Sequence, residues 1–316
     1  MNYDSIFNCF PNDIKCEIEK IIDIKEIQNS ALEEIRIRLN LPIILKVGKN
    51  EKIIQHIITR EEINYVLQRI CDNSLYSYQG QIANGYVTIN GGHRVGIVGS
   101  AVIKEGQVIN LNYISGLNFR VSRQIIDCSK NIINYIIDKN YNNVFNTLII
   151  SPPGLGKTTL LRDIVRKISN GFNIDENIKF EGINVTVIDE RGEIGACYKG
   201  IPQNDLGIRT DIFDDIPKSL GINMAIRAMS PKVIVADEIG SIKDADAIKY
   251  ATCCGIKGIF TAHGKNANDL NINPALQDLV KNKIFELIIF IKDRNMGKFY
   301  TEIYRLNSEK EKYELL

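Results

Sequence analysis

The chain has 316 residues, of which 44% are hydrophobic and 24% charged, and its formal net charge is +1. This length exceeds the roughly 100–200 residues of one domain and predicts two. A charge so close to zero gives no global attraction to nucleic acid or to an anionic membrane. The sequence has no apolar run near the ~20 residues of a membrane helix and does not begin like a secretory signal, so we expect a cytoplasmic protein.

The cysteines argue for the same compartment. Seven cysteines are scattered along the chain without a Cys-x-x-Cys pair, and only three histidines accompany them. This set predicts neither a disulfide framework nor a structural zinc site. The adjacent Cys253 and Cys254 are expected to be small buried side chains rather than a redox pair.

The first half of the chain is predicted to combine helices with antiparallel strands. Apolar residues at helical spacing predict a helix over 4–24, and alternating residues predict strands between 33 and 58. Thr59 is followed three residues later by Glu62, which is the pattern of a capping box, so a helix is predicted to begin there.

Two hairpins and a connecting helix complete this half. Glycine-rich turns at Gly91-Gly92 and at Glu105-Gly106 separate alternating apolar runs and therefore predict hairpins. A helix is expected over 129–139. These features predict a small N-terminal α/β domain over residues 1–128 and a linker helix within residues 129–142.

From Asn143 onward, short apolar strands alternate with helical segments. This alternation predicts an α/β domain over 143–316 whose mostly parallel sheet is covered by helices on both faces. The last two strands are expected to form an antiparallel hairpin that turns near Met296-Gly297.

The most informative segment lies between an apolar strand and a helix, which is the setting that a phosphate-binding loop requires. It consists of Ser151, Pro152, Pro153, Gly154, Leu155, Gly156, Lys157, Thr158 and Thr159. The glycines allow backbone N–H groups to surround phosphate, Lys157 is predicted to reach the β and γ phosphates, and Thr158 to ligate magnesium. Ser151 stands where the strict pattern has glycine. The segment predicts that the chain binds ATP with Mg²⁺.

Two carboxylates follow the buried strand predicted over 232–236. Asp237 and Glu238 must emerge at the carboxyl end of this strand, where open parallel sheets bind ligands. Asp237 is predicted to hold Mg²⁺ through water, and Glu238 to orient and deprotonate the attacking water. The two acids convert a prediction of nucleotide binding into one of ATP hydrolysis.

Two further strand ends carry polar residues. Asp189, Glu190, Arg191 and Glu193 crowd the end of one strand, where Glu190 serves either the nucleotide site or an ion-pair network. The other strand ends in Thr-Ala-His, and we expect His263 to sense the γ-phosphate through a hydrogen bond.

Transition-state charge on the γ-phosphoryl group needs an additional cation. Several arginines lie outside the loop, among them Arg94, Arg120, Arg123, Arg191, Arg209 and Arg227. Each is a candidate for that cation, and each alone is also consistent with a surface ion pair.

The order of phosphate loop, acidic strand, Asp-Glu strand and Thr-x-His resembles the secretion-ATPase superfamily of type II and type IV secretion and pilus motors. The segment 225–240 is similar to the stretch around the Walker B motif of that superfamily. Two positions depart from it. Asp237 stands where the motors often have glycine, and Gly240 replaces a frequent arginine of the subunit interface.

The segments GHRVGIVG and PQNDLGIRTD further resemble a family of sporulation proteins from endospore-forming bacteria. The resemblance implies a RecA-like ATPase in the second half and a hexameric ring. It implies that Arg120 or Arg123 reaches the γ-phosphate. It also implies that the ring lies on the mother-cell side of the channel to the forespore and energises assembly of the channel or transport through it. The implied partners are membrane proteins of the same complex.

Two alternatives stay open. A nucleic-acid motor on the same core requires a basic stripe, which the near-neutral charge and the scattered Lys and Arg residues do not favour, so we expect no nucleic-acid partner. A nucleotide-dependent scaffold without turnover would not need Lys157, Thr158, Asp237 and Glu238 together, although slow hydrolysis remains compatible with the sequence.

Overall fold

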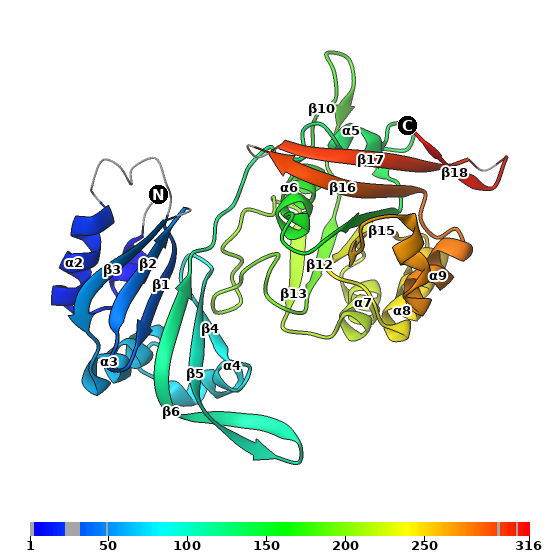
Figure 1. Cartoon of the computed structure of the whole chain (residues 1–316). Coiled ribbons are helices and arrows are strands. Elements are labelled where there is room, and N and C mark those ends of the chain that lie inside the picture. The colour runs from blue at the N-terminus through cyan, green and yellow to red at the C-terminus, as the bar shows by residue number, and fades with distance from the viewer. Residues whose placement is uncertain (1–2, 23–31, 49, 296–297, 308) are drawn as a thin grey trace. The chain divides into compact units, whose positions relative to one another are not determined.

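A computed structural model describes residues 3–22, 32–48, 50–295, 298–307 and 309–316 (Figure 1). The chain forms two compact units. One comprises Met1–Arg123 together with Ala196–Gln203, and the other comprises Gln124–Gly195 and Asn204–Leu316. The units therefore divide at residue 123 rather than 128, and a short segment from the second half of the chain packs as part of the first unit.

The first unit is an antiparallel sheet in the order β3-β2-β1-β6-β5-β4, with helices on one face. Its strands are β1 (Leu32–Arg38), β2 (Pro42–Val47), β3 (Asn50–Ile57), β4 (Tyr86–Ile89), β5 (His93–Lys104) and β6 (Gln107–Arg120). Its helices are α1 (Asp4–Phe7), α2 (Asn12–Ile22), α3 (Arg60–Ile70), the 3₁₀ turn η1 (Leu75–Tyr78) and α4 (Gln79–Ala83).

Apolar and polar side chains alternate along the strands of this unit, and the apolar ones form a single hydrophobic core. Ile35 and Ile37 of β1 are fully buried, and they join Phe119 of β6 and Ile14 and Ile63 of the helices in one cluster. The residues between them on the strands face away from this core, as the two-residue period of a strand requires. The strands and hairpins predicted for this half are confirmed, including both glycine turns.

The single helix expected over 4–24 is wrong. The chain forms α1 and α2 with a break at Phe10-Pro11, because proline has no N–H to donate to a continuing helix. The end of the expected helix, residues 23–24, lies outside the described residues.

The second unit is built on the sheet β13-β12-β14-β15-β9-β16-β17-β18. Its strands are β9 (Thr147–Ser151), β12 (Val185–Asp189), β13 (Thr210–Asp214), β14 (Val233–Ala236), β15 (Lys257–His263), β16 (Leu287–Asn295), β17 (Lys298–Asn307) and β18 (Lys312–Leu315). The strands from β13 to β16 run parallel, and β17 and β18 are antiparallel. Two short pairs accompany the sheet: β7 (Ile137–Asp138) with β8 (Asn143–Val144), and β10 (Phe172–Asn173) with β11 (Lys179–Phe180).

Helices cover both faces of this sheet, as predicted. They are α6 (Lys157–Asn170), α7 (Lys218–Ala228), α8 (Ile242–Cys253), the 3₁₀ turn η2 (Ala267–Asn271) and α9 (Pro274–Lys281). Ile149 of β9 packs in the core on the α6 side, whereas its neighbours Leu148 and Ile150 pack in the core under α7 and α8. The central strands are therefore buried on both faces, which explains their uninterrupted apolar sequences.

Three local expectations need correction or restriction. The helix expected over 129–139 is wrong for most of its length, because α5 (Ile133–Ile136) is a single turn followed directly by the short strand β7. The turn at Met296-Gly297 lies outside the described residues, although the two strands that it joins are paired. Cys253 and Cys254 are exposed at the end of α8 rather than buried.

Within the part of the chain that the structure describes, none of the helices has the length and apolarity to cross a membrane.

Candidate functional site

The loop between β9 and α6 has the backbone shape of a phosphate-binding loop. Gly154 and Gly156 adopt φ angles of 80° and 92°, a left-handed region that residues with a Cβ atom seldom enter. A Cβ atom on Gly156 would lie 2.7 Å from a guanidinium nitrogen of Arg294. The backbone conformation therefore favours glycine at this position, and the start of α6 directs its free N–H groups into the loop.

Lys157 is the first residue of α6, and its side chain is buried beneath the loop. Its Nζ donates to the carbonyl oxygen of Ser151 at 3.2 Å and lies 3.0 Å from Nδ1 of His263. Burial lowers the pKa of Lys157, while the nearby Asp237 and Glu238 carboxylates oppose that shift. The ammonium group is thus held at the loop by two fixed partners.

The end of β14 brings the two predicted acids to the same edge. Asp237 accepts hydrogen bonds from the hydroxyl of Thr158, the second residue of α6, and from the hydroxyl of Thr261 on β15. Asp237 therefore joins the loop to the neighbouring strand. β14 and β15 are adjacent and parallel, so their carboxyl ends meet here as the sequence predicted.

Glu238 contacts the other predicted site residue. Its Oε1 lies 2.9 Å from Nε2 of His263, and its second carboxylate oxygen accepts a hydrogen bond from Arg191. His263 also contacts Lys157, so its ring connects the lysine of the loop to the carboxylate. His263 and Glu238 thus lie together at the loop, and the positive charge of Arg191 offsets the negative charge of Glu238.

The acidic residue at the end of β12 has a structural role. Asp189, at the end of β12, is buried and accepts backbone N–H groups from Glu193, Ile194 and Gly195 at 2.8–2.9 Å. Burial raises the pKa of Asp189, and these three hydrogen bonds oppose the shift. Asp189 therefore shapes the following loop.

Glu190 forms an ion pair with the buried Lys218 at the start of α7. This geometry is the ion-pair network that the sequence left open as an alternative. A role for Glu190 at the nucleotide stays a prediction.

Arg120 and Arg123 both belong to the first unit. Arg123 donates to the carbonyl oxygen of Leu32 at 2.7 Å. Arg120 lies directly opposite Arg94 on β5 and Glu34 on β1, and so shares one face of the sheet with them. Their proposed action on a γ-phosphate stays a prediction.

Sequence reasoning did not identify Arg294, near the end of β16. Its guanidinium lies against Gly156 and 5.2 Å from the centre of the Phe299 ring. Arg162 was also missed. It projects from α6, one turn after Thr158, and burial lowers its pKa against the opposing charges of Asp189 and other carboxylates. The sequence signal for Arg162 was its helical spacing from the loop, whereas Arg294 carried none because it is distant along the chain.

The donor set fits a nucleotide with magnesium. Thr158 and Asp237 offer a hydroxyl and a carboxylate within hydrogen-bond contact of each other, and oxygen donors of this kind suit Mg²⁺. The glycine loop, the helix start and Lys157 supply N–H groups and positive charge for phosphate oxygens. These residues can bind the phosphates and metal of a nucleoside triphosphate at one edge of the sheet.

Solved structures of the same fold are secretion and pilus ATPases. The ATPase DotB of Legionella pneumophila matches with a TM-score of 0.58 and 15% identity, covering 93% of this chain and 82% of DotB. The pilus retraction motor PilT, in a crystal structure with bound ADP, matches with a TM-score of 0.57 and 15% identity, covering 95% and 82%. At this identity the likeness shows that the chain has the fold of these P-loop ATPases.

Sequence comparison is more specific. The chain is 38% identical over 264 residues to stage III sporulation protein AA of Bacillus subtilis, covering 84% of this chain and 83% of the relative. It is also 31% identical over 171 residues to the protein SEEDLING PLASTID DEVELOPMENT 1 of Arabidopsis thaliana, of which it covers 22%. A family model described as "Sporulation stage III, protein AA" matches residues 9–310. The chain therefore belongs to the sporulation stage III protein AA family.

Proposed function

We propose that this chain is a Mg²⁺-dependent ATPase that acts as the motor of a sporulation channel. The observation that carries the proposal is the meeting of five predicted residues at one sheet edge, where Thr158 contacts Asp237 and His263 contacts both Lys157 and Glu238. A nucleotide-binding protein without turnover would need the lysine and the glycine loop. It would not need a second carboxylate fixed beside them.

Each side chain has a separate role in the proposed hydrolysis. Lys157 neutralises phosphate charge, and the backbone N–H groups of the loop hold the phosphate oxygens. Thr158 and Asp237 hold Mg²⁺, which supplies further neutralisation of the β and γ phosphates. Glu238 accepts the proton of the attacking water, and its orientation is fixed from Thr261, whose hydroxyl accepts the backbone N–H of Glu238 at 2.9 Å.

Arg191 now occupies one oxygen of Glu238, and His263 the other. Both carboxylate oxygens of Glu238 are therefore engaged by side chains, which leaves neither of them free to contact an attacking water. We infer that Arg191 moves away from Glu238 when water and nucleotide enter. Turnover would then depend on the movement of Arg191, which lies in the loop that Asp189 holds through the N–H groups of Glu193 and Gly195.

The arginines of the first unit support a shared site in a hexameric ring. Arg94 and Arg120 are directly opposite each other on neighbouring strands, and Glu34 lies opposite Arg120 on its other side. The two arginines place positive charge on one face of the sheet, which a phosphate group would complement. We propose that Arg120 or Arg123 completes the nucleotide site in cis or from a neighbouring subunit.

Membership of the sporulation family supports the biological setting. We propose that the ring is peripheral to the mother-cell side of the membrane around the forespore. Its partners would be membrane proteins of the channel complex, and ATP turnover would energise channel assembly or transport.

The site is tested with two substitutions in the full chain. Lys157→Ala is expected to abolish ATP binding, because it removes the ammonium group that is held at the loop by Ser151 and His263. Glu238→Gln is expected to retain binding of a fluorescent ATP analogue but to lose turnover by a factor of about 10² or more. Phosphate release and equilibrium binding measure the two effects separately.

Lys257→Ala is the matched control. Lys257 lies at the opposite end of β15 and pairs with Glu286 at 2.6 Å, so its loss should leave both measurements unchanged. Wild-type hydrolysis by Lys157→Ala would show that the site is assigned wrongly. Equal, negligible turnover by the wild type and Glu238→Gln, with ATP bound tightly by both, would favour the scaffold alternative.

A further inference from the structure

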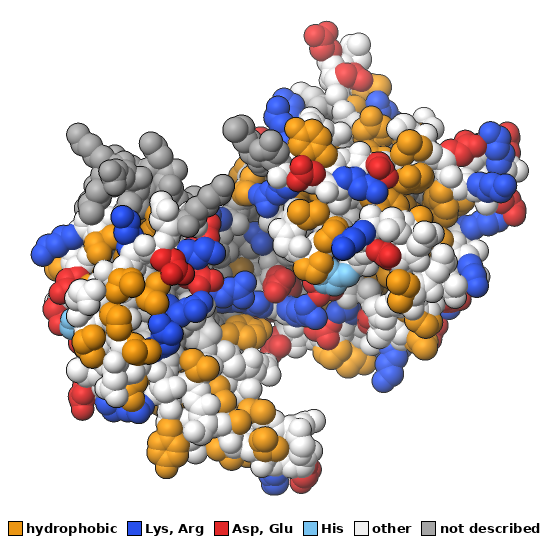
Figure 2. All heavy atoms as spheres, in the orientation of Figure 1, with side chains coloured by type: hydrophobic (Ala, Val, Ile, Leu, Met, Phe, Trp, Pro, Cys, Tyr) orange, Lys and Arg blue, Asp and Glu red, His pale blue; other side chains and the backbone are white. Residues whose placement is uncertain are grey.

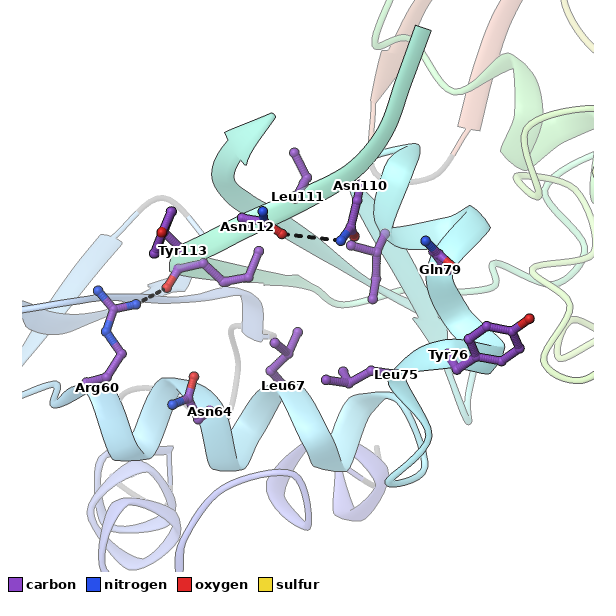
Figure 3. Close-up of a pocket in the computed structure, with 12 residues that line it drawn as sticks. Arg60, Asn64, Leu67, Leu75, Tyr76, Gln79, Asn110, Leu111, Asn112 and Tyr113 are labelled. Atoms are coloured by element: carbon purple, nitrogen blue, oxygen red, sulfur yellow. Dashed lines mark hydrogen bonds between the residues drawn. The ribbon is translucent and has the colours of Figure 1, made fainter. Parts of the chain in front are cut away.

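The first unit carries a groove of its own, with a volume of about 680 Å³ (Figure 3). One wall is α3, from which Arg60, Asn64 and Leu67 project, and the opposite wall is the stretch 110–114 of β6. The segment 75–82 closes one end. Ligand pockets in proteins commonly have volumes of about 300–1,000 Å³, so the groove can hold several residues of a peptide.

The groove lies along the edge of β6 rather than on one of its faces. All five consecutive residues from Asn110 to Ile114 line it. Asn110, Leu111 and Asn112 lie in the regular part of the strand, where successive side chains point to opposite faces, so a pocket on one face would not be lined by all three. Tyr113, with a φ of 50°, departs from this alternation. The carbonyl oxygen of Ile114 points into the groove, since it accepts a hydrogen bond from Arg60 across the groove at 2.5 Å. A backbone group that points into the groove is what an edge position predicts.

This edge of β6 has no strand beside it among the described residues. β1 pairs with β6 over Gly116–Arg120, and the N–H of Leu39 adds a hydrogen bond to the carbonyl oxygen of Ser115 before the chain turns at Asn40 with a φ of 60°. Over Gln107–Asn112, β6 pairs with β5 alone. An edge strand of this kind presents N–H and C=O groups that can pair with another chain.

The open edge also lacks the usual protection against pairing. Soluble proteins place lysine, proline or other charged residues on exposed edges. The sequence of Gln107–Tyr113 is QVINLNY, which has neither a charge nor a proline. Large apolar side chains on the same hairpin are exposed, and Figure 2 shows hydrophobic side chains gathered on this projecting part of the molecule. They are Val98, Ile103, Val108, Ile109 and Tyr113.

The lining specifies the chemistry of an occupant. Arg60 is the one charged residue among the residues that line the groove, and it lies at the end of the groove near Ile114. Leucine and isoleucine side chains alternate with amides along the walls. These are Leu67, Leu75, Ile82 and Leu111, with the amides Asn64, Gln79, Asn110 and Asn112. Tyr76 and Tyr113, which are 88% and 81% exposed, stand at the rims.

We propose that this groove binds an extended segment of a partner protein by β-strand addition to β6. The segment occupies the position beside β6 that β1 would fill if β1 continued past Arg38. Its backbone pairs with residues 110–113, its alternate apolar side chains enter between β6 and α3, and an acidic side chain meets Arg60. The lined stretch of five residues spans about 16 Å, so about five residues of the partner are held.

The test uses the full chain and random peptides displayed on phage, selected on the immobilised protein. Peptides with apolar residues at alternate positions and one acidic residue are expected to be enriched. An enriched peptide is then synthesised with a fluorophore and its affinity measured by anisotropy. Methylation of alternate backbone amides should abolish binding, whereas methylation of the intervening amides should leave it intact, because only one set of amides faces β6.

Two variants place the peptide in the groove. Leu75→Asp, on the apolar wall, is expected to weaken binding at least about tenfold. Arg60→Gln should weaken it about fivefold, and it should have no effect on a peptide whose acidic residue is replaced by its amide. Ile53→Asp is the control, since Ile53 is an exposed apolar residue on β3, away from the groove-lining residues. Thermal unfolding checks that each variant is folded.

Three results would overturn the proposal. One is selection that enriches no such peptide, and another is equal binding by Leu75→Asp and Ile53→Asp. The third is self-association of the wild type that Leu75→Asp removes, since the edge would then be covered by a second copy of this chain. Protection of the amides of residues 107–113 from hydrogen exchange by the peptide would support it.

Discussion

Glu238 adopts a backbone conformation that a residue with a side chain seldom holds. Its φ angle is 53°, in the left-handed region, which costs about 1–2 kcal/mol for a non-glycine residue. Thr261 compensates for this cost, because its hydroxyl accepts the N–H of Glu238 and its carbonyl accepts the N–H of Ile239. The strained turn directs the Glu238 carboxylate toward His263.

Arg294 is expected to strengthen nucleotide binding. Its guanidinium lies beside Gly156, where a phosphate would add negative charge, and stacking on Phe299 holds it there. We expect Arg294→Ala to weaken ATP affinity about fivefold to tenfold, as the loss of one charge-assisted contact predicts. Titration with a fluorescent ATP analogue measures this change.

Arg305→Ala provides a closely matched control. Arg305 belongs to the same hairpin and lies 4.3 Å from the centre of the Phe145 ring, so it makes the same kind of stacking contact. Its register places it opposite Leu287, at the end of β16 remote from the loop. If both variants lose affinity equally, the effect of Arg294 comes from hairpin stability and not from the nucleotide.

Asp163 on α6 is expected to make stability fall in acid. Burial alone would raise its pKa, but hydrogen bonds from Ser129, Arg166 and the N–H of Asp127 outweigh burial and lower it. A lowered pKa stabilises the fold above the unfolded value near 3.9, and this contribution is lost as pH falls through the folded value.

Asp163→Asn should cost about 3 kcal/mol at neutral pH, since it removes one acceptor oxygen and the negative charge that bond to Asp127, Ser129 and Arg166. It should also flatten the decrease in unfolding temperature between about pH 5 and pH 3. Calorimetry across that range measures both effects. An equally steep acid decrease in wild type and variant would show that another carboxylate controls it.

At the scale of elements, α3 begins with a complete capping box. The Thr59 hydroxyl accepts the N–H of Glu62, and the Glu62 carboxylate accepts the N–H of Thr59 at 2.8 Å. Thr59→Ala is expected to destabilise the first unit by about 1 kcal/mol, whereas Thr59→Ser should retain most of that stability. Urea unfolding distinguishes the two. Similar losses for both variants would assign the effect to packing of the threonine methyl group.

The elements that were predicted correctly from the sequence differ in length and burial from those that were predicted wrongly. The central strands β9, β12 and β14 are buried on both faces, so their short apolar runs were unambiguous. The segment 129–139 has helical spacing but forms only one turn before pairing as β7. Isolated short helices are marginal, and tertiary pairing replaces them readily.

At the scale of the whole molecule, the proposed ring makes assembly depend on nucleotide. We expect the 316-residue chain to form hexamers in ATP with Mg²⁺ and smaller species without nucleotide, because the proposed shared site would link neighbouring subunits. Mass photometry measures the distribution directly. Arg120→Ala should reduce the hexamer fraction, while Arg305→Ala should not, and a monomer under every condition would contradict the ring.

The sequence by itself determined the phosphate loop, the acidic strand ends and the two-part organisation, because glycine conformation, apolar runs and charge at strand ends are local properties. Tertiary structure alone decided which side chains meet. It placed Arg294 against Gly156 from more than a hundred residues away and assigned Glu190 to Lys218. It also ended β1 early enough to leave an edge of β6 open. Such contacts depend on strand register and on where neighbouring strands stop, and no local pattern in one sequence encodes either.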